Sequence, residues 1–466
     1  MKTRCLLTIS PFLFALFAIG CSQSQLQPQP QPPSPTPSAL PVTIEPQSVV
    51  MKHGDRWTFA ASNVSGAASV NWSIQEGSAG GAISSDGVYT APAIDGVYHV
   101  MATSKADPSK SATATVSVGG HGFALTSSLR TPRYLHTATL LPNGLVYVAG
   151  GETQLDYDVA LADRAELFNP AMGAFEPTGQ VARELHAATL LQNGDVLFTG
   201  GITGESPSGI VLTGTAELLK AGSASLQPTR NMGFQRCGHK ATLLPDGRVL
   251  ITGGSTQSGT KIAATRSAEI YDPASGTFMP VGNMRAARQS HSATLLLTGK
   301  VLITGGGSAD AELFDPATNS FTPAGSTSSP GSMTTLLADG RALITDGSTA
   351  QSQLYDPVAG QFTSTGAMAT SRSNYTANLL PDGTVLIAGG YIQVATSTPG
   401  TFSIVPVTST EIYSLATGSF TPGPTMRQGR HGHTATLLPD GGVLFVGGIG
   451  PCCSLSTPLA SAEIYR

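Results

Sequence analysis

The sequence predicts an all-β protein in which one four-stranded unit is repeated around a closed ring. The first observation is a recurring phrase, Arg-x-x-His followed by Thr-Leu-Leu, a Pro-Asp-Gly-type turn and Gly-Gly, with its clearest copies at Arg236 and Arg430. Further copies begin at Arg133, Arg183, Arg288 and Arg372, and a degraded copy runs from Thr335 to Gly347. The second observation is the spacing of roughly 40–55 residues between copies, which is typical of one propeller blade per repeat. Seven copies therefore predict a seven-bladed β-propeller.

The composition agrees with turn-rich β structure. The 466 residues include 54 Gly and 32 Pro, and only 12% are charged. This balance favours strands and turns over amphipathic helices. The formal net charge is −4, and no basic stretch is interleaved with aromatic residues. Both features argue against a nucleic-acid partner.

Residues 1–21 are expected to be an export signal. Lys2 and Arg4 supply the positive start, and the apolar run that follows is shorter than the ~20 residues needed to span a bilayer. Its end, Ala18-Ile19-Gly20-Cys21, resembles a bacterial lipobox, which implies lipidation of Cys21. Ordinary secretory cleavage with an incidental Cys21 is the alternative. Ser22 is not the aspartate associated with inner-membrane retention, so the resemblance favours a lipid anchor in the outer membrane.

A linker and a small β-sandwich are expected before the propeller. Residues 22–40 are mostly Gln, Pro and Ser, which bury little and form an extended spacer. Within residues 41–118, Arg56–Phe59 and Val70–Ile74 alternate apolar and polar side chains, as strands do. This segment resembles bacterial Ig-like domains, with Trp72 on a central strand. The resemblance implies a spacer or, alternatively, an adhesive module.

The propeller is expected to occupy residues 122–466, with four strands in each repeat. His-x-Ala-Thr-Leu-Leu forms the inner strand and Val-Leu-Ile-Thr-Gly-Gly the second, while Ala268–Pro273 and Gly276–Pro280 exemplify the third and fourth. The last repeat stops after its third strand, and residues 122–127 supply the missing fourth. The ring is therefore expected to close with strands from both ends of the propeller, which removes free sheet edges.

Binding residues are expected on the rim that carries the connections between second and third strands. These connections are long in five blades and short only at Gly307–Asp310 and Ser348–Ala350, so a notch is expected over blades four and five. Long variable loops on a rigid scaffold are where binding residues concentrate. The candidate contacts are Asp156, Tyr157, Asp158 and Tyr391. The alternative is that these side chains are merely solvated.

The repeated charged residues admit two interpretations. The arginines could trap anions on the rim, and the five histidines of the phrase could surround a metal ion; these are His136, His186, His239, His291 and His433. However, a third-strand Glu accompanies the Arg in every blade except blade five, which has Ser329 and Gln353 instead. The pattern predicts a buried Arg–Glu pair in each of the other blades. Because blades stack face to face, the histidines should point at neighbouring blades, so neither a metal site nor a cofactor is expected.

The cysteines leave several redox states open. Cys237, Cys452 and Cys453 remain once the export segment is set aside. An odd number in an exported protein allows one disulfide with a free thiol, or three thiols. A bridge between the adjacent Cys452 and Cys453, a bridge to Cys237, and reduced thiols are the alternatives.

The strand pattern, with Phe and Tyr on the third and fourth strands and Gly-Gly closing the second, resembles kelch repeats over about three-quarters of the chain. A kelch propeller beside an Ig-like domain is similar to galactose oxidase. That resemblance implies a copper radical site made of a Cys cross-linked to Tyr, a second Tyr and two His. Here Cys237 is the only plausible thiol, and no Tyr adjoins a His within residues 122–466.

We therefore expect a protein of the cell envelope that is not an enzyme but a non-catalytic ligand- or protein-binding module. Its expected partner is an envelope or extracellular protein or glycan. The alternative is a propeller enzyme, either a galactose-oxidase-like oxidase or a carbohydrate-active enzyme, with its site on the loop-rich face. A structural adhesin that makes its contacts through the sandwich is a third hypothesis.

Overall fold

Residues 42–466 are described by a computed structural model, except for residues 63–69, 95, 120, 156–159, 207–208, 259–260, 396–401 and 453–454. Cys21 and the expected signal and linker lie outside the described residues. Within them, no helix is long and apolar enough to cross a membrane.

Residues 42–119 form a β-sandwich. One sheet has the order β2 (Ser48–Met51), β9 (Ser111–Val118), β8 (Gly96–Ser104) and β5 (Val70–Ile74). The other has the order β3 (Arg56–Thr58), β7 (Val88–Thr90) and β6 (Ala82–Ile83). In addition, β1 (Thr43–Glu45) pairs with β4 (Ala60–Ser62), and a 3-10 turn covers Gly77–Gly80. Alternate side chains of these strands, among them Trp57, Tyr89, Val100 and Val116, fill the core between the sheets.

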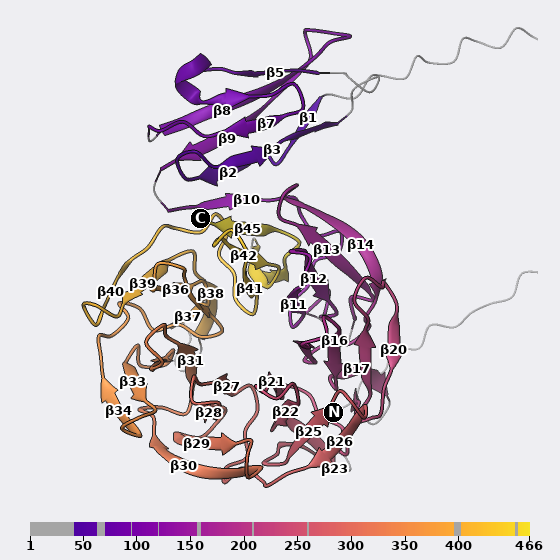
Figure 1. Cartoon of the computed structure of the whole chain (residues 1–466), viewed down its shortest axis with the longest axis vertical. Helices are drawn as coiled ribbons and strands as arrows, with labels where there is room; N and C mark the ends of the chain where they lie inside the picture. The colour runs from indigo at the N-terminus through magenta and orange to yellow at the C-terminus, as the bar shows by residue number, and fades with distance from the viewer. Residues whose placement is uncertain are drawn as a thin grey trace, which may run out of the picture. The chain divides into compact units, whose positions relative to one another are not determined.

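The propeller consists, within the described residues, of seven four-stranded antiparallel sheets arranged around a channel (Figure 1). Blade one contains β11 (Thr137–Leu140), β12 (Val146–Ala149), β13 (Arg164–Asn169) and β14 (Ala174–Gln180). Blade two contains β15 (Ala187–Leu190), β16 (Val196–Thr199), β19 (Ala216–Leu219) and β20 (Leu226–Pro228). Blade three contains β21 (Lys240–Leu243), β22 (Val249–Thr252), β25 (Ala268–Asp272) and β26 (Thr277–Pro280). The first-named strand of each blade is the inner one.

The remaining blades repeat this order. Blade four contains β27 (Ser292–Leu295), β28 (Val301–Thr304), β29 (Asp310–Asp315) and β30 (Ser320–Ser326). Blade five contains β31 (Ser332–Leu336), β32 (Ala342–Asp346), β33 (Ser352–Asp356) and β34 (Gln361–Ser364). Blade six contains β35 (Thr376–Leu379), β36 (Val385–Ala388), β39 (Thr410–Ser414) and β40 (Ser419–Pro422). Blade seven contains β41 (Thr434–Leu437), β42 (Val443–Val446), β45 (Ala462–Tyr465) and β10 (Phe123–Leu125).

The second strand of each blade is the most buried. Every residue of β22 and β28, for example, is buried, in the sequence Val-Leu-Ile-Thr. Such a strand has a neighbouring strand on each side and a neighbouring blade on each face, so all of its side chains face protein. This is why the repeat shows a continuous apolar run here rather than an alternating one.

Blade seven is completed from the other end of the propeller. β10 pairs antiparallel with β45, with Phe123 opposite Tyr465 and Leu125 opposite Glu463. Phe123 is buried between the rings of Phe445 and Tyr465, at centroid distances of 5.4 and 5.3 Å. The strand therefore provides both the missing edge pairing and an aromatic contact to the last sheet.

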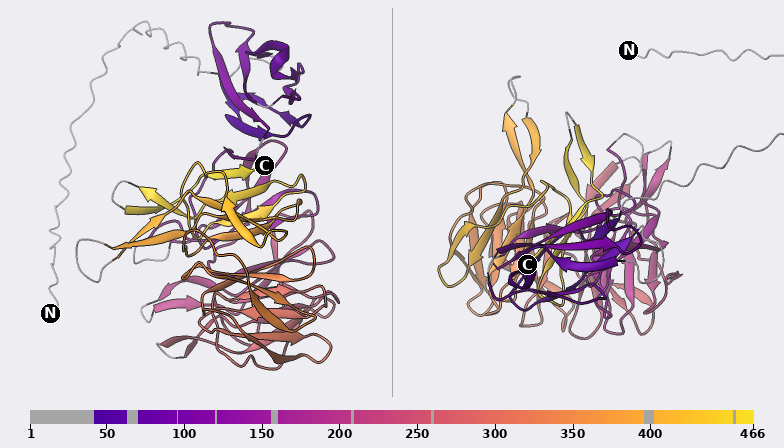
Figure 2. Two further views of the ribbon diagram at one scale, coloured as in Figure 1. Left: turned by 90° about the vertical axis from the view of Figure 1, so that its left-hand side faces the viewer. Right: turned by 90° about the horizontal axis from the view of Figure 1, so that it is seen from above.

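The long connections between second and third strands are mostly β-hairpins. Four described pairs extend from the blades: β17 (Ile202–Ser206) with β18 (Gly209–Leu212), β23 (Ser255–Ser258) with β24 (Lys261–Ala264), β37 (Tyr391–Ala395) with β38 (Phe402–Pro406), and β43 (Ile449–Cys452) with β44 (Leu455–Pro458). Figure 2 shows the hairpins projecting from one face of the ring. This face is the expected loop-rich rim, and paired strands make its projections more regular than loops.

Candidate active site at the mouth of the channel

The repeated arginines are buried inside their blades. Arg133, Arg236, Arg288 and Arg430 are completely buried, and each repeated arginine forms an ion pair with the third-strand Glu of its own blade. The N–O distances lie between 2.7 and 3.1 Å in five blades, and Arg183 pairs with Glu217 in the sixth case. The predicted Arg–Glu pairing is confirmed. The arginines therefore do not form an anion trap on the rim.

Each pair also forms hydrogen bonds with backbone groups of its own blade. The guanidinium of Arg288 donates to the carbonyl of Gly305, and the same bond to the first glycine of Gly-Gly recurs in the other pairs, always 17 residues along the chain. The carboxylate of Glu312 accepts backbone N–H groups from Arg285 and Ala286. A buried charge is tolerated only when its donors and acceptors are satisfied in this way.

The repeated histidines join neighbouring blades. Nε2 of His186, His239 and His291 bonds the hydroxyl of Thr137, Thr199 and Thr252, respectively, in the preceding blade, at 2.8–2.9 Å. His433 and His136 make the same contact with Thr376 and Thr434. Blade six uses Tyr375, whose hydroxyl bonds Thr345 at 2.6 Å. Because Nε2 is engaged between blades, these histidines are fasteners of the ring.

Burial keeps this ring of histidines neutral. It lowers the pKa of His186 and of His291 to about 3, and the pKa of His136, His239 and His433 well below the ordinary value. The nearby arginines act in the same direction. The five imidazoles thus contribute hydrogen bonds without adding charge around the channel.

A belt of backbone hydrogen bonds runs around the channel just before the inner strands. The N–H groups of Leu185, Gly238 and Ser290 donate to the carbonyls of Leu135, Leu185 and Gly238, respectively, and Gly432 donates to Asn374. Leu135, Leu185, Ser290 and Asn374 adopt left-handed backbone conformations, with φ between 51° and 55°, to make this geometry. Among the described residues the belt is interrupted across blade five, between Ser290 and Asn374, and between Gly432 and Leu135.

The degraded repeat explains the interruption at blade five. Ser329 stands in place of the arginine, and Gln353 in place of the glutamate accepts only the N–H of Ser328. Ser329 and Ser348 contact each other at 3.3 Å, and Ser348 donates to Asp346 at 2.7 Å. Short hydroxyl side chains therefore stand in blade five where the other blades have a guanidinium.

A pocket of about 450 Å³ lies at this position. It is bounded by residues of blades three to six, and its polar lining includes Lys240, Gln289, Ser290, Ser292, Ser348, Ser373, Asn374 and Tyr391. Its volume is within the range of roughly 300–1,000 Å³ that small-molecule sites occupy. The pocket coincides with the notch expected over blades four and five. It is the candidate active site.

Of the predicted contact residues, Tyr391 lines this pocket. Asp156, Tyr157 and Asp158 lie outside the described residues. The ring of Tyr391 packs edge-on against His431, with centroids 4.9 Å apart. Nδ1 of His431 is buried without a hydrogen-bond partner, and burial lowers the pKa of its imidazole. A neutral imidazole therefore lies directly behind the phenol.

His431 belongs to a set of mouth residues that sequence reasoning missed. In five of the six blades that carry a repeated arginine, the next residue forms a β-bridge with the residue after Gly-Gly, as in Tyr134 with Glu152, Cys237 with Ser255, and His431 with Ile449. These positions vary from blade to blade although they lie inside the repeated phrase. A signal was present in the sequence, because variation at a fixed place in an otherwise constant phrase indicates a position that folding does not require.

Two acidic members of this set, Glu152 and Glu184, belong to blades one and two and are not part of the pocket lining. Burial, together with the neighbouring Glu152, raises the pKa of Glu184 to about 8, and Tyr134 donates to Glu152 at 2.5 Å. The thiol of Cys237 is free and buried, and burial raises its pKa to about 11. The raised pKa describes an unreactive, protonated thiol. Cys453 and the side chain of Cys452 lie outside the described residues.

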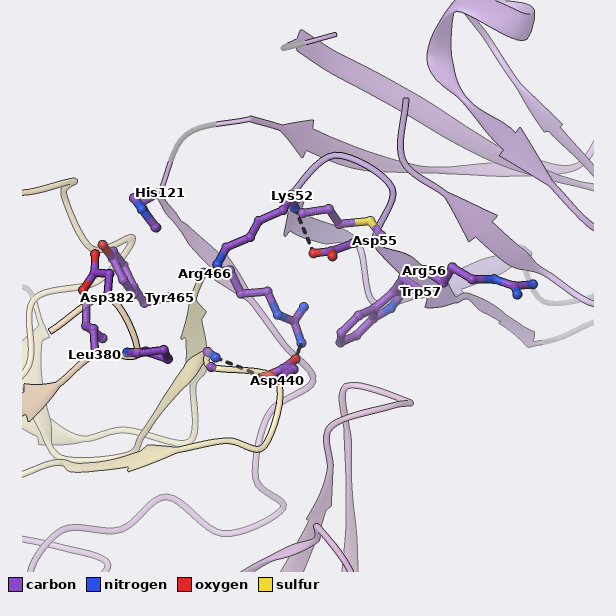
Figure 3. Close-up of a pocket in the computed structure, with 14 residues that line it drawn as sticks. Lys52, Asp55, Arg56, Trp57, His121, Leu380, Asp382, Asp440, Tyr465 and Arg466 are labelled. Atoms are coloured by element: carbon purple, nitrogen blue, oxygen red, sulfur yellow. Dashed lines mark hydrogen bonds and ion pairs between the residues drawn. The ribbon is translucent and has the colours of Figure 1, made fainter. Parts of the chain in front are cut away.

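A second pocket, of about 190 Å³, lies between the sandwich and blades six and seven. Figure 3 shows the guanidinium of Arg466 between Asp440 and Trp57. Arg466 bonds Asp440 at 2.7 Å and lies 4.3 Å from the centre of the Trp57 ring, while His121 stacks on Tyr465. Its prominent cation and aromatic groups contact one another, so this pocket is read as a structural junction.

Copper ligation was tested against the described donors. They contain no group of three or more His, Cys, Asp or Glu side chains that could hold a metal ion. At the mouth, Tyr391 and His431 are adjacent, but the imidazole Nε2 of each ring histidine is bonded to a threonine of the preceding blade. The described residues do not fit the Cys, two-Tyr and two-His set of a copper radical site.

Comparison with known proteins gives a likeness of fold. No family model and no curated protein matches the chain. A fungal alcohol oxidase of the AA5 family, solved in complex with copper and noted for catalytic diversity, aligns with a TM-score of 0.57 and 20% sequence identity. The alignment covers 75% of this chain and 76% of that chain. The two proteins share a fold.

The comparison corrects the expectation of a non-catalytic binding module that is not an enzyme. One solved structure that shares the fold is an alcohol oxidase in complex with copper. The sequence argument looked for Tyr and His side by side in the chain. The structure instead brings Tyr391, which follows Gly-Gly in blade six, against His431, which follows the repeated arginine in blade seven.

Proposed function

We propose that this protein is a carbohydrate-active enzyme whose active site is the pocket at the mouth of the channel. The observation that carries the proposal is the pocket's lining of hydroxyl, amide and amine groups together with Tyr375 and Tyr391. Such donors and acceptors match the hydroxyl groups of a sugar, and Tyr391 offers an apolar ring face. The shared fold with an alcohol oxidase supports a substrate that carries hydroxyl groups.

In this proposal Tyr391 is the group that exchanges a proton with the substrate. Its phenol lines the pocket, and the neutral His431 packs behind it. A positioned acid or base of this kind contributes about 10²–10⁴-fold to a rate. Ser348 of blade five and Asn374 of blade six, which both line the pocket, would orient the sugar. No step is assigned to copper, because the described donors do not fit it.

The test is turnover by the purified protein on a panel of oligosaccharides, with and without added copper. We expect new sugar products whose formation does not depend on copper. Tyr391→Phe should lower kcat by at least about 10²-fold while the melting temperature is unchanged. Tyr134→Phe, a mouth tyrosine outside the pocket, is the matched control and should retain activity. Copper-dependent peroxide release from sugars or alcohols would replace the proposal with an oxidase, and absence of any turnover would overturn it.

We further propose that the enzyme is exported, anchored through a lipid on Cys21 and held away from the membrane by residues 22–40 and an Ig-like sandwich. The support is the lipobox-like sequence and the Gln- and Pro-rich linker. Metabolic labelling with a fatty-acid analogue should label the wild-type protein and not the Cys21→Ala variant. An unlabelled wild-type protein would contradict the anchor.

A further inference from the structure

Lys240 interrupts the repeat at the first position of an inner strand. The strand pairings place it in register with Thr137, Ala187, Ser292, Met333, Thr376 and Thr434 of the other blades. Several of these hydroxyls bond the histidine of the next blade. In blade three that role is taken by Thr252, which bonds His291 at 2.8 Å. Lys240 is therefore not needed as a fastener between blades.

The ammonium group of Lys240 has no counter-ion among the described residues. No ion pair or side-chain hydrogen bond of Lys240 is found there, and its side chain is accessible to solvent inside the channel. The surrounding blades remove part of its hydration, and this desolvation lowers its pKa. The neighbouring ring histidines are neutral. The other cation that lines the pocket, Arg372, is paired with Glu411.

The pocket around Lys240 contains no carboxylate in its lining. Asp346 is buried and is not part of the lining, and its carboxylate accepts hydrogen bonds from Ser348 and Thr349. The side-chain oxygen of Gln289 accepts a bond from Ser255, which leaves the amide N–H₂ of Gln289 as a donor. The pocket thus combines one unpaired positive charge with neutral donors.

We infer that the natural substrate is an acidic sugar, with Lys240 as the counter-ion of its carboxylate. This inference rests on the proposed function and narrows its substrate class from carbohydrates in general to uronic-acid-containing ones. Lys240 would fix the charged unit of the substrate, and Gln289 and Asn374 would donate to the same carboxylate or to adjacent hydroxyls. An uncharged sugar would leave the ammonium group without a partner in a partly desolvated site, which is unfavourable.

The experiment measures binding to the full-length protein by calorimetry at low and physiological salt. The probes are oligogalacturonate, the matching neutral galacto-oligosaccharide, a sulfated sugar and a sugar phosphate. We expect oligogalacturonate to bind at least about tenfold more tightly than the neutral probe, because only its carboxylates can pair with Lys240. This ratio corresponds to about 1.4 kcal/mol of binding free energy. Lys240→Met should remove this preference, while Lys261→Met, on the hairpin of the same blade, should leave it unchanged.

Each outcome decides the inference. Equal binding of acidic and neutral probes, or an unchanged preference in Lys240→Met, would overturn it, and continued turnover of neutral sugars would show that the proposed function survives. Preference for the sulfated or phosphorylated probe would overturn the carboxylate assignment. If the wild-type protein neither binds nor turns over any of these probes, the proposed function is refuted. Because Lys240 is solvent-accessible, the variant's melting temperature should match that of the wild type.

Discussion

At the scale of single residues, the charged and histidine side chains that recur in most blades serve the fold. Arg288 shows this role clearly, since its guanidinium is fully buried and bonded to Glu312 at 3.1 Å and to the carbonyl of Gly305. Burial lowers the pKa of the repeated arginines Arg133, Arg183, Arg236, Arg372 and Arg430, and the paired glutamates oppose that shift. Each of the two buried charges is therefore tolerated only while its partner is present.

Removing one partner of this pair should destabilise the protein more than removing both. Arg288→Met leaves the carboxylate of Glu312 buried without its cation, which typically costs about 3–5 kcal/mol. Arg288→Met combined with Glu312→Leu should cost less, because no buried charge remains. Urea unfolding of the two variants measures the difference. A double variant that is less stable than the single one would refute a role for the pair in charge compensation.

The buried Arg–Glu pairs were predicted correctly from the sequence, whereas most of the residues at the mouth of the channel were not predicted. Co-occurrence of Arg and Glu across repeats, with joint loss in blade five, was enough to predict the buried pair, because both residues change together. Tyr391 was identified from its place on a long connection. His431, Lys240 and Gln289 were not, because each comes from a different blade, and their proximity arises from the closure of the ring rather than from spacing along the chain.

At the scale of elements, β10 is the strand on which closure of the ring depends. It supplies the fourth strand of blade seven and buries Phe123 against Phe445 and Tyr465. Without it, β45 would present an unpaired edge. The other six blades contain strands from one continuous segment each, so none of them depends on a distant part of the chain in this way.

Deletion of residues 121–127 should therefore lower the melting temperature of the whole propeller. Loss of the β10–β45 pairing and of a buried phenylalanine should cost at least about 3–5 kcal/mol, the usual effect of truncating such a side chain. Differential scanning calorimetry provides the measurement, with Phe123→Asp as a smaller lesion of the same strand. Shortening the exposed β23–β24 hairpin serves as the control. An unchanged melting temperature in the deletion would contradict this role of β10.

At the scale of the whole molecule, the histidine fasteners give the ring a common response to acid. The pKa of His186 and of His291 is about 3 in the folded protein, because burial disfavours the charged imidazole, whereas an exposed histidine has a pKa of about 6.5. Between these values the unfolded chain binds more protons than the folded one. Stability should thus be full above about pH 6.5 and should decrease as the pH falls towards 3.

Replacing one fastener with the residue that blade six already uses should weaken this response. His291→Tyr places a phenol opposite Thr252, as Tyr375 lies opposite Thr345, and removes one group that titrates on unfolding. The slope of unfolding free energy against pH near pH 5 should fall by the equivalent of about one proton. Chemical denaturation across pH 4–7 measures it, with His53→Tyr, at an exposed site in the sandwich, as the control. An unaltered slope would show that His291 is already charged in the folded state.

The architecture as a whole was predictable because the same pattern of strands and turns occurs seven times in the sequence. Seven copies of one phrase specify strand order, turns and the number of blades, and the structure agrees in each sheet. The hairpins β17–β18, β23–β24, β37–β38 and β43–β44 were expected only as long connections, since their sequences occur once each. Function resides in such unrepeated parts, and a single copy offers no internal comparison from which to infer a role.

The pairing of β10 with β45 also has a consequence for how the protein is made. Blades one to six can each form as soon as their own residues have left the ribosome, since every one of them is a continuous segment. Blade seven must wait, because residues 123–125 are made early and their partners at 462–465 more than three hundred positions later. During that interval Phe123 and the edge of β10 that pairs with β45 remain uncovered, so this short segment is where a chaperone that binds the nascent chain would have most to protect.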